Sequence, residues 1–257
     1  MTGVWTVTKK ELKSFLYSPI AYILTAFFLL VCGFFFYNIL VWVNQQAMRL
    51  MQSQYAMQYM DRLNINRMLY EPFFNNMTII LMFLLPLLTM KLFADEKKMR
   101  TEELLLTSPI KVWPLILGKY LAALIIYFFI LLLTATFSIF VFAYGNPYPA
   151  PLLTAYLGLF LLGAVFIAIG IFASSLTENQ VIAAVISFSA ILLIWVISWV
   201  GEGASGWAGI FSYLSFFTHF QNMARGIIDS QDIIYYLSFI FIGLYLTYTV
   251  FEFRKWR

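Results

Sequence analysis

The stretch Gly145-Asn-Pro-Tyr-Pro-Ala-Pro151 interrupts the longest uncharged run of the chain, residues 120–177. Proline has no backbone N–H and a fixed φ angle, so prolines at alternate positions favour a turn over a continuous helix. A helix that spans a membrane needs about 20 mostly apolar residues, and each half of the run is long enough. The stretch therefore predicts two spans, at 114–144 and 151–174.

The rest of the chain has the same apolar character. Its 257 residues are 62% hydrophobic and 11% charged, whereas a soluble domain has about 25% charged residues. Further apolar runs predict spans at 20–43, 73–93, 180–200 and 232–252. The first run is longer than the apolar part of a signal peptide, so we expect it to be retained. The predicted fold is all-α: an integral membrane protein with six transmembrane helices in a single domain, 1–257.

The run 203–224 is uncharged but rich in glycine, serine and amide side chains. Its more apolar part, 207–220, is short for a span and is typical of a re-entrant or interfacial element. A seventh span here would also move the basic tail, 254–257, to the outside, against the positive-inside rule. We therefore predict a re-entrant external element between spans five and six.

The distribution of basic residues fixes the predicted orientation. With six spans and a cytoplasmic N-terminus, both termini are cytoplasmic, and 12 of the 16 basic residues lie inside. These are Lys9, Lys10, Lys13, Lys91, Lys97, Lys98, Arg100, Lys111, Lys119, Arg254, Lys255 and Arg257.

The N-terminal segment before Pro19 has an amphipathic helical pattern. Apolar side chains cover one side of the helix and lysines cover the other, which is typical of a helix lying in the membrane–water interface. A simple anchor and a lever that a cytoplasmic partner moves both fit this pattern. The residues that define the predicted interfacial helix are Trp5, Lys9, Lys10, Glu11 and Lys13.

A charged segment, residues 95–109, separates the second and third predicted spans. Thr101 is suited to cap a short helix, since Glu102 and Glu103 then lie near the positive end of the helix dipole. Three leucines follow, and an apolar patch on a cytoplasmic loop usually contacts a partner. A solvated loop that only obeys the charge rule is the alternative. The predicted contact residues are Asp95, Glu96, Lys97, Lys98, Arg100, Thr101, Glu102, Glu103, Leu104, Leu105 and Leu106.

Four groups of residues follow one another along the chain. They are Lys9-Lys-Glu-Leu12 with Ser18-Pro19, Thr101-Glu-Glu-Leu-Leu-Leu-Thr-Ser-Pro109 with Gly118-Lys119, Ala173-Ser-Ser-Leu-Thr-Glu-Asn-Gln180, and Phe217-Thr-His-Phe-Gln-Asn-Met-Ala-Arg-Gly226. In this order and spacing the chain resembles permease subunits of the ABC-2 family of ATP-binding-cassette exporters, and most closely the gliding-motility-associated sub-type. Many members of that family carry glycine where this chain has Arg100.

The resemblance implies the membrane half of an ATP-driven exporter in the bacterial inner membrane, with residues 95–109 as a coupling helix. It implies two copies of an ABC ATPase subunit, a second permease that is identical or paralogous, an external auxiliary protein and contact with membrane lipids. Nucleic acid is not an expected partner.

The chain itself is not expected to be an enzyme. Gly118-Lys119 is not part of a P-loop, because that pattern requires glycine at position 113 and serine or threonine at position 120, which are Trp113 and Tyr120. We expect ATP and Mg²⁺ on the partner ATPase, and neither a cofactor nor a metal on this chain.

Two alternatives for the function stay open. The first is an accessory membrane scaffold that docks an ATPase without transporting. The second is an intramembrane serine protease, suggested by Gly203-Ala-Ser-Gly206 and His219, although nothing in the sequence brings a nucleophile within reach of that base. The residues that mark the external element are Trp207, His219 and Arg225.

Overall fold

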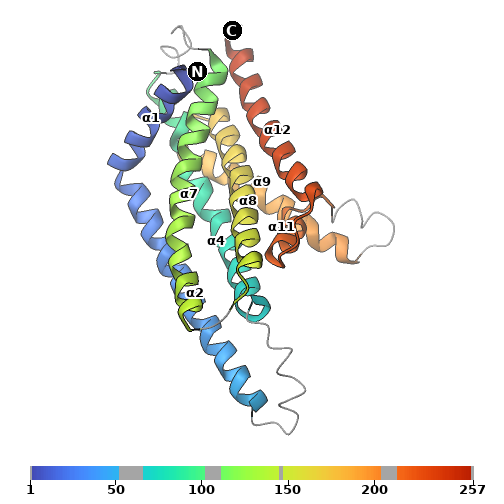
Figure 1. Cartoon of the computed structure of the whole chain (residues 1–257). Helices are drawn as coiled ribbons and strands as arrows, with labels where there is room; N and C mark the ends of the chain where they lie inside the picture. Colours follow the sequence, from blue (N-terminus) through green and yellow to red (C-terminus); the bar gives the residue numbers. More distant parts are fainter. Residues whose placement is uncertain (1, 52–65, 102–110, 145–146, 204–212, 256–257) are drawn as a thin grey trace.

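A computed structural model describes residues 2–51, 66–101, 111–144, 147–203 and 213–255 (Figure 1). In this part of the chain all regular structure is helical, as predicted. The elements are α1 (Thr2–Tyr17), α2 (Pro19–Met51), the π-helical turn η2 (Asn66–Tyr70), α4 (Glu71–Thr89), α5 (Lys91–Lys98), α7 (Val112–Tyr144), α8 (Pro149–Leu176), α9 (Gln180–Gly203), α11 (Phe216–Ala224) and α12 (Ser230–Lys255).

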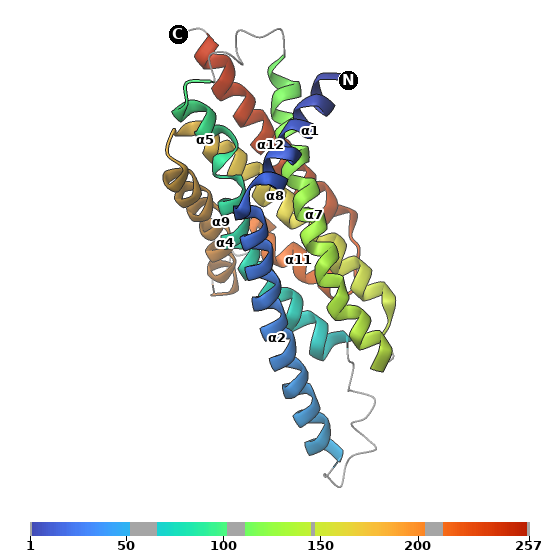
Figure 2. The same cartoon turned by 90° about the vertical axis from the view of Figure 1, so that its left-hand side faces the viewer.

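Among the described residues, six helical stretches are long and apolar enough to cross a membrane, which confirms the predicted number. They are Pro19–Arg49, Arg67–Lys98, Val112–Ala143, Pro149–Leu176, Gln180–Ile197 and Ser230–Arg254. The start of α1 and the end of α12 lie at the same end of the bundle (Figures 1 and 2), which we call the terminal end.

Prolines set two of the helix boundaries. α1 ends and α2 begins at Ser18-Pro19, where Pro19 takes the first helical position and needs no hydrogen-bond acceptor for its nitrogen. α7 ends at Tyr144 and α8 begins at Pro149, as the proline-rich stretch predicts. α2 continues to Met51, well past the predicted limit at residue 43, because the Gln, Ala, Met and Arg residues that follow are good helix formers.

The centre of the bundle is α8, which packs against α4, α7, α9, α11 and α12. In the most apolar 18-residue stretch of α8, 72% of the residues are buried, compared with 17% in the corresponding stretch of α9. Glycines allow this close packing. A Cβ at Gly163 would lie 2.3 Å from the ring of Tyr127, and one at Gly170 would lie 2.0 Å from Thr89 Oγ1. Span four therefore packs closely against its neighbours at both positions.

The second span is not a single regular helix. α4 ends at Thr89, Met90 forms a turn, and α5 continues to Lys98, so the charged residues 95–98 extend the span helix. The joint has an identifiable cause, since a serine of α8 is inserted there. Ser174 Oγ accepts from the N–H groups of Phe93 (3.0 Å) and Ala94 (3.1 Å) and donates to Met90 O (2.8 Å).

Candidate functional site

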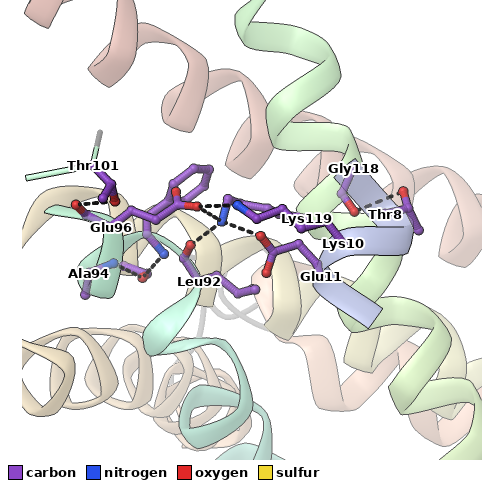
Figure 3. A network of polar contacts seen from close by, with 11 residues as sticks. Thr8, Lys10, Glu11, Leu92, Ala94, Glu96, Thr101, Gly118 and Lys119 are labelled. Atoms are coloured by element: carbon purple, nitrogen blue, oxygen red, sulfur yellow. Dashed lines mark hydrogen bonds and ion pairs between the residues drawn. The ribbon is translucent and has the colours of Figure 1, made fainter. Parts of the chain in front are cut away.

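A buried lysine lies where three helices meet at the terminal end (Figure 3). The side chain of Lys119, on α7, is 1% exposed. Its ammonium group donates to Glu11 Oε1 on α1 (2.9 Å), to Glu96 Oε1 on α5 (2.9 Å) and to Leu92 O on α5 (2.6 Å). All three ammonium protons therefore have an acceptor. One side chain holds α1 and α5 to α7.

The charges around Lys119 are balanced. A buried charge is tolerated only when it is paired and hydrogen-bonded, and two carboxylates on one ammonium leave an excess of negative charge. Lys10 Nζ lies 3.7 Å from Glu96 Oε1 and is 66% exposed, so it supplies the second positive charge from the solvent side. The ring of Phe93 lies 5.0 Å from Lys119 Nζ. We call Lys10, Glu11, Glu96 and Lys119 the Lys119 cluster.

Gly118 explains how α1 reaches the cluster. A Cβ at this position would lie 2.6 Å from Val7 Cβ, so any larger residue would push α1 away from α7. Thr8 Oγ1, on α1, donates to Gly118 O at 3.2 Å. The pair Gly118-Lys119 thus has a structural role, with glycine admitting α1 and lysine bonding to it.

The other side of α5 is bonded to α8 and α9. Lys97 Nζ donates to Ser175 O at the end of α8, and Gln180 Nε2, at the start of α9, donates to Asp95 Oδ1. Together with Ser174 at the joint, these bonds connect α5 to both helices. Asp95, Glu96 and Lys97, predicted as contact residues for a partner, therefore have bonding partners inside the bundle.

α5 ends in a left-handed turn. Arg100 has φ 54°, its N–H donates to Lys97 O, and the N–H of Thr101 donates to Glu96 O, both at 2.9 Å. This is the Schellman arrangement, in which the left-handed residue is usually glycine because a Cβ is unfavourable there. Arg100 replaces the glycine of many ABC-2 permeases, and it therefore lies at a position where glycine fits best. Lys98, Met99 and Arg100 are exposed.

Thr101 is the last described residue before 102–110, so its predicted role as the N-cap of a helix in that segment lies outside the described residues. Its Oγ1 donates to Glu96 O at 3.1 Å, so it caps the end of α5. The remaining predicted coupling residues, Glu102 to Leu106, lie outside the described residues.

The predicted interfacial helix, α1, has its charged residues on two sides. Trp5, Lys9, Lys10 and Lys13 are exposed, whereas Glu11 points inward to Lys119. Sequence reasoning grouped Glu11 with the lysines and assigned Lys119 no role in binding. The signal that could have found the pair is a lysine directly after a glycine inside an apolar helix, with a single acidic residue in the preceding amphipathic helix.

The segment predicted as an external element holds a second polar cluster in the described residues. His219 Nδ1 lies 2.5 Å from Asp232 Oδ1, His219 Nε2 lies 2.8 Å from Tyr213 O, and the ring of Tyr235 stacks on the imidazole at 4.0 Å. A carbonyl oxygen only accepts, so Nε2 carries a proton and donates it to Tyr213 O. His219 thus has neither ring nitrogen free to act as a base in this arrangement.

Arg225, also predicted to mark this element, forms an ion pair with the start of α4. Arg225 Nε donates to Glu71 Oε1 at 3.2 Å, and Arg67 lies 3.9 Å from the same carboxylate, so Arg225 joins α11 to the start of α4. Trp207 and Ser205 lie outside the described residues.

The family model described as ABC-2 family transporter protein matches residues 5–256 of the chain. The match includes α1 from Trp5 onward, the Lys119 cluster and all six candidate spans. No curated protein matches the chain.

Proposed function

Because the chain belongs to the ABC-2 transporter family and is the membrane component of an ABC transporter, we propose that it is the permease of an ATP-driven exporter. Family membership implies association with an ABC ATPase. In the proposal, two copies of that ATPase bind at the terminal end, and ATP-driven movement passes from them through residues 95–109 into the spans.

The observation that supports this proposal is the bonding of α5. This short helix leads directly into residues 102–110, and its side chains and backbone are bonded to α1, α7, α8 and α9. A displacement applied to α5 therefore acts on four other helices at once. Rigid-body movement of packed helices is a common way in which a local push becomes a global change.

The terminal end is proposed to be cytoplasmic, in the bacterial inner membrane. The positive-inside rule supports this orientation, since 12 of the 16 basic residues belong to segments on that side in the six-span topology. Export as the direction, a second permease, an external auxiliary protein and the gliding-motility-associated sub-type are proposed from the order of the four sequence motifs.

Charge reversal in the coupling segment tests the proposal. Glu102→Lys with Glu103→Lys is expected to abolish co-purification of the Walker-type ATPase with the permease in detergent. Glu178→Lys is the matched control, because Glu178 is exposed directly after α8 and lies outside the segment 95–109. Equal recovery of the ATPase with the double variant and the control would show that the segment does not bind it.

Reconstitution separates an exporter from an accessory scaffold. Proteoliposomes that contain permease and ATPase are expected to lose lipid- or solute-dependent stimulation of ATP hydrolysis when Glu102 and Glu103 are reversed. A scaffold would bind the ATPase without any stimulation in the wild-type complex, and that result would contradict the exporter proposal. Ser205→Ala is expected to change neither readout, whereas a loss of proteolytic activity in this variant would support the protease alternative.

A further inference from the structure

The bend between α1 and α2 contains a basic hollow. It has a volume of about 670 Å³ and is lined by Lys9, Lys10, Lys13, Tyr17 and Tyr22, together with two leucines. The three lysines are exposed, and Lys13 Nζ lies 5.8 Å from the centre of the Tyr17 ring. Flexible ammonium groups of this kind bind phosphate as compact point charges.

A second hollow has the opposite character. It has a volume of about 460 Å³ and lies between α1, α2 and α7, where Ala26, Ile126 and Phe129 are among its lining residues. Its wall is almost entirely apolar, with Thr25 and Tyr22 contributing the only hydroxyl groups among its lining residues. The Thr25 hydroxyl is already used, because it donates to Ala21 O at 2.8 Å.

The two hollows meet. Leu16 and Tyr22 line both of them, so the basic hollow and the apolar hollow share a wall at the bend between α1 and α2. Three positive charges therefore stand at one end of an apolar groove that runs along two candidate spans. Tyrosines such as Tyr17 and Tyr22 are typical of the level at which headgroups meet acyl chains.

We propose that this bend is a binding site for an anionic glycerophospholipid, whose phosphate lies among Lys9, Lys10 and Lys13 and whose acyl chain occupies the groove between α2 and α7. Charge complementarity selects the headgroup, and the continuous apolar wall selects a chain-bearing ligand over a free phosphate. The lipid also reaches the Lys119 cluster, because Lys10 is the residue that lies 3.7 Å from Glu96. The bound phosphate competes with Glu96 for that lysine.

Native mass spectrometry of the full chain in detergent tests the site, with phosphatidylglycerol as the anionic probe and phosphatidylcholine as the zwitterionic one. Lys9→Gln, Lys10→Gln and Lys13→Gln combined are expected to weaken phosphatidylglycerol binding by about tenfold or more, since basic residues near the membrane surface attract anionic lipid. Lys98→Gln is the matched control, because Lys98 is exposed at the same end and lines neither hollow.

A second variant tests the groove independently of charge. Ala26→Phe fills the groove from α2, and Ala26 is exposed, so the bundle can accept the larger side chain. It is expected to weaken phosphatidylglycerol binding by at least about fivefold while all three lysines are present. Unfolding midpoints of both variants within a few degrees of wild type exclude a loss of fold.

The outcomes are distinct. Equal binding of phosphatidylcholine and phosphatidylglycerol, or a triple lysine variant that binds like Lys98→Gln, would overturn the proposal. Displacement of the lipid by millimolar inorganic phosphate, with Ala26→Phe binding like wild type, would show a plain anion site and would also overturn it.

Discussion

Removal of the Lys119 ammonium group is expected to destabilise the protein strongly. In Lys119→Met the side chain keeps a similar length, but Glu11 and Glu96 lose their shared partner, and Leu92 O loses a donor. Both carboxylates have largely buried side chains, at 11% and 15% exposed. They then face each other with only the exposed ammonium group of Lys10 nearby, 3.7 Å from Glu96 Oε1.

The magnitude follows from the geometry. Two carboxylate oxygens that each lay 2.9 Å from one nitrogen are within about 6 Å of each other, where unit charges repel by roughly 3 kcal/mol at an effective dielectric constant of about 20. Removing one partner of a buried pair typically costs about 3–5 kcal/mol. Because both carboxylates keep some access to water, we expect a loss of about 3 kcal/mol in the free energy of unfolding.

The assay is equilibrium unfolding in mixed micelles of SDS and a mild detergent, followed by the fluorescence of the seven tryptophans. Two variants complete the design. Lys119→Met combined with Glu11→Gln and Glu96→Gln removes the repulsion and should recover about 2 kcal/mol. Lys10→Met removes an exposed lysine 3.7 Å from Glu96 and should change stability by less than about 1 kcal/mol. Lys119→Met within about 1 kcal/mol of wild type, or a combined variant no more stable than Lys119→Met, would refute the reasoning.

Five further variants test other parts of the bundle by the same measurement. Ser174→Ala removes three hydrogen bonds at a buried joint and should cost at least about 2 kcal/mol, so a loss below about 0.5 kcal/mol would contradict the assigned role. Gly163→Ala places a Cβ 2.3 Å from a buried tyrosine ring and should cost about 1–3 kcal/mol, whereas Gly33→Ala meets its nearest ring at 3.5 Å and should be neutral or stabilising. Arg100→Gly relieves a left-handed backbone and should add about 1 kcal/mol, while Arg100→Ala should add nothing.

The spans could be predicted from the sequence because the signals that define them are local. An uncharged run of sufficient length and a proline-rich break are both contained in a few neighbouring residues, and they correctly separated α7 from α8. The end of α2 was placed too early because polar residues such as Asn44 end a hydropathy run without ending a helix.

The candidate site could be predicted only in part because its bonds connect distant residues. The charged residues 95–98 were recognised as important, yet their partners, such as Ser175 and Gln180, belong to segments about 80 residues further along the chain. Lys119 near the start of a span reads in the sequence as a lysine whose ammonium group reaches the membrane surface. Only the packing of α1 against Gly118 shows that its ammonium group is buried.

The serine at the joint between α4 and α5 has a consequence for the order of assembly. Ser174 belongs to the fourth candidate span, whereas Phe93, Ala94 and Met90 belong to the second. During synthesis the second span is completed some 80 residues before this hydroxyl exists, and buried backbone groups without partners are costly. The joint therefore reaches its native shape only after the fourth span is inserted, which makes it a late step in biogenesis.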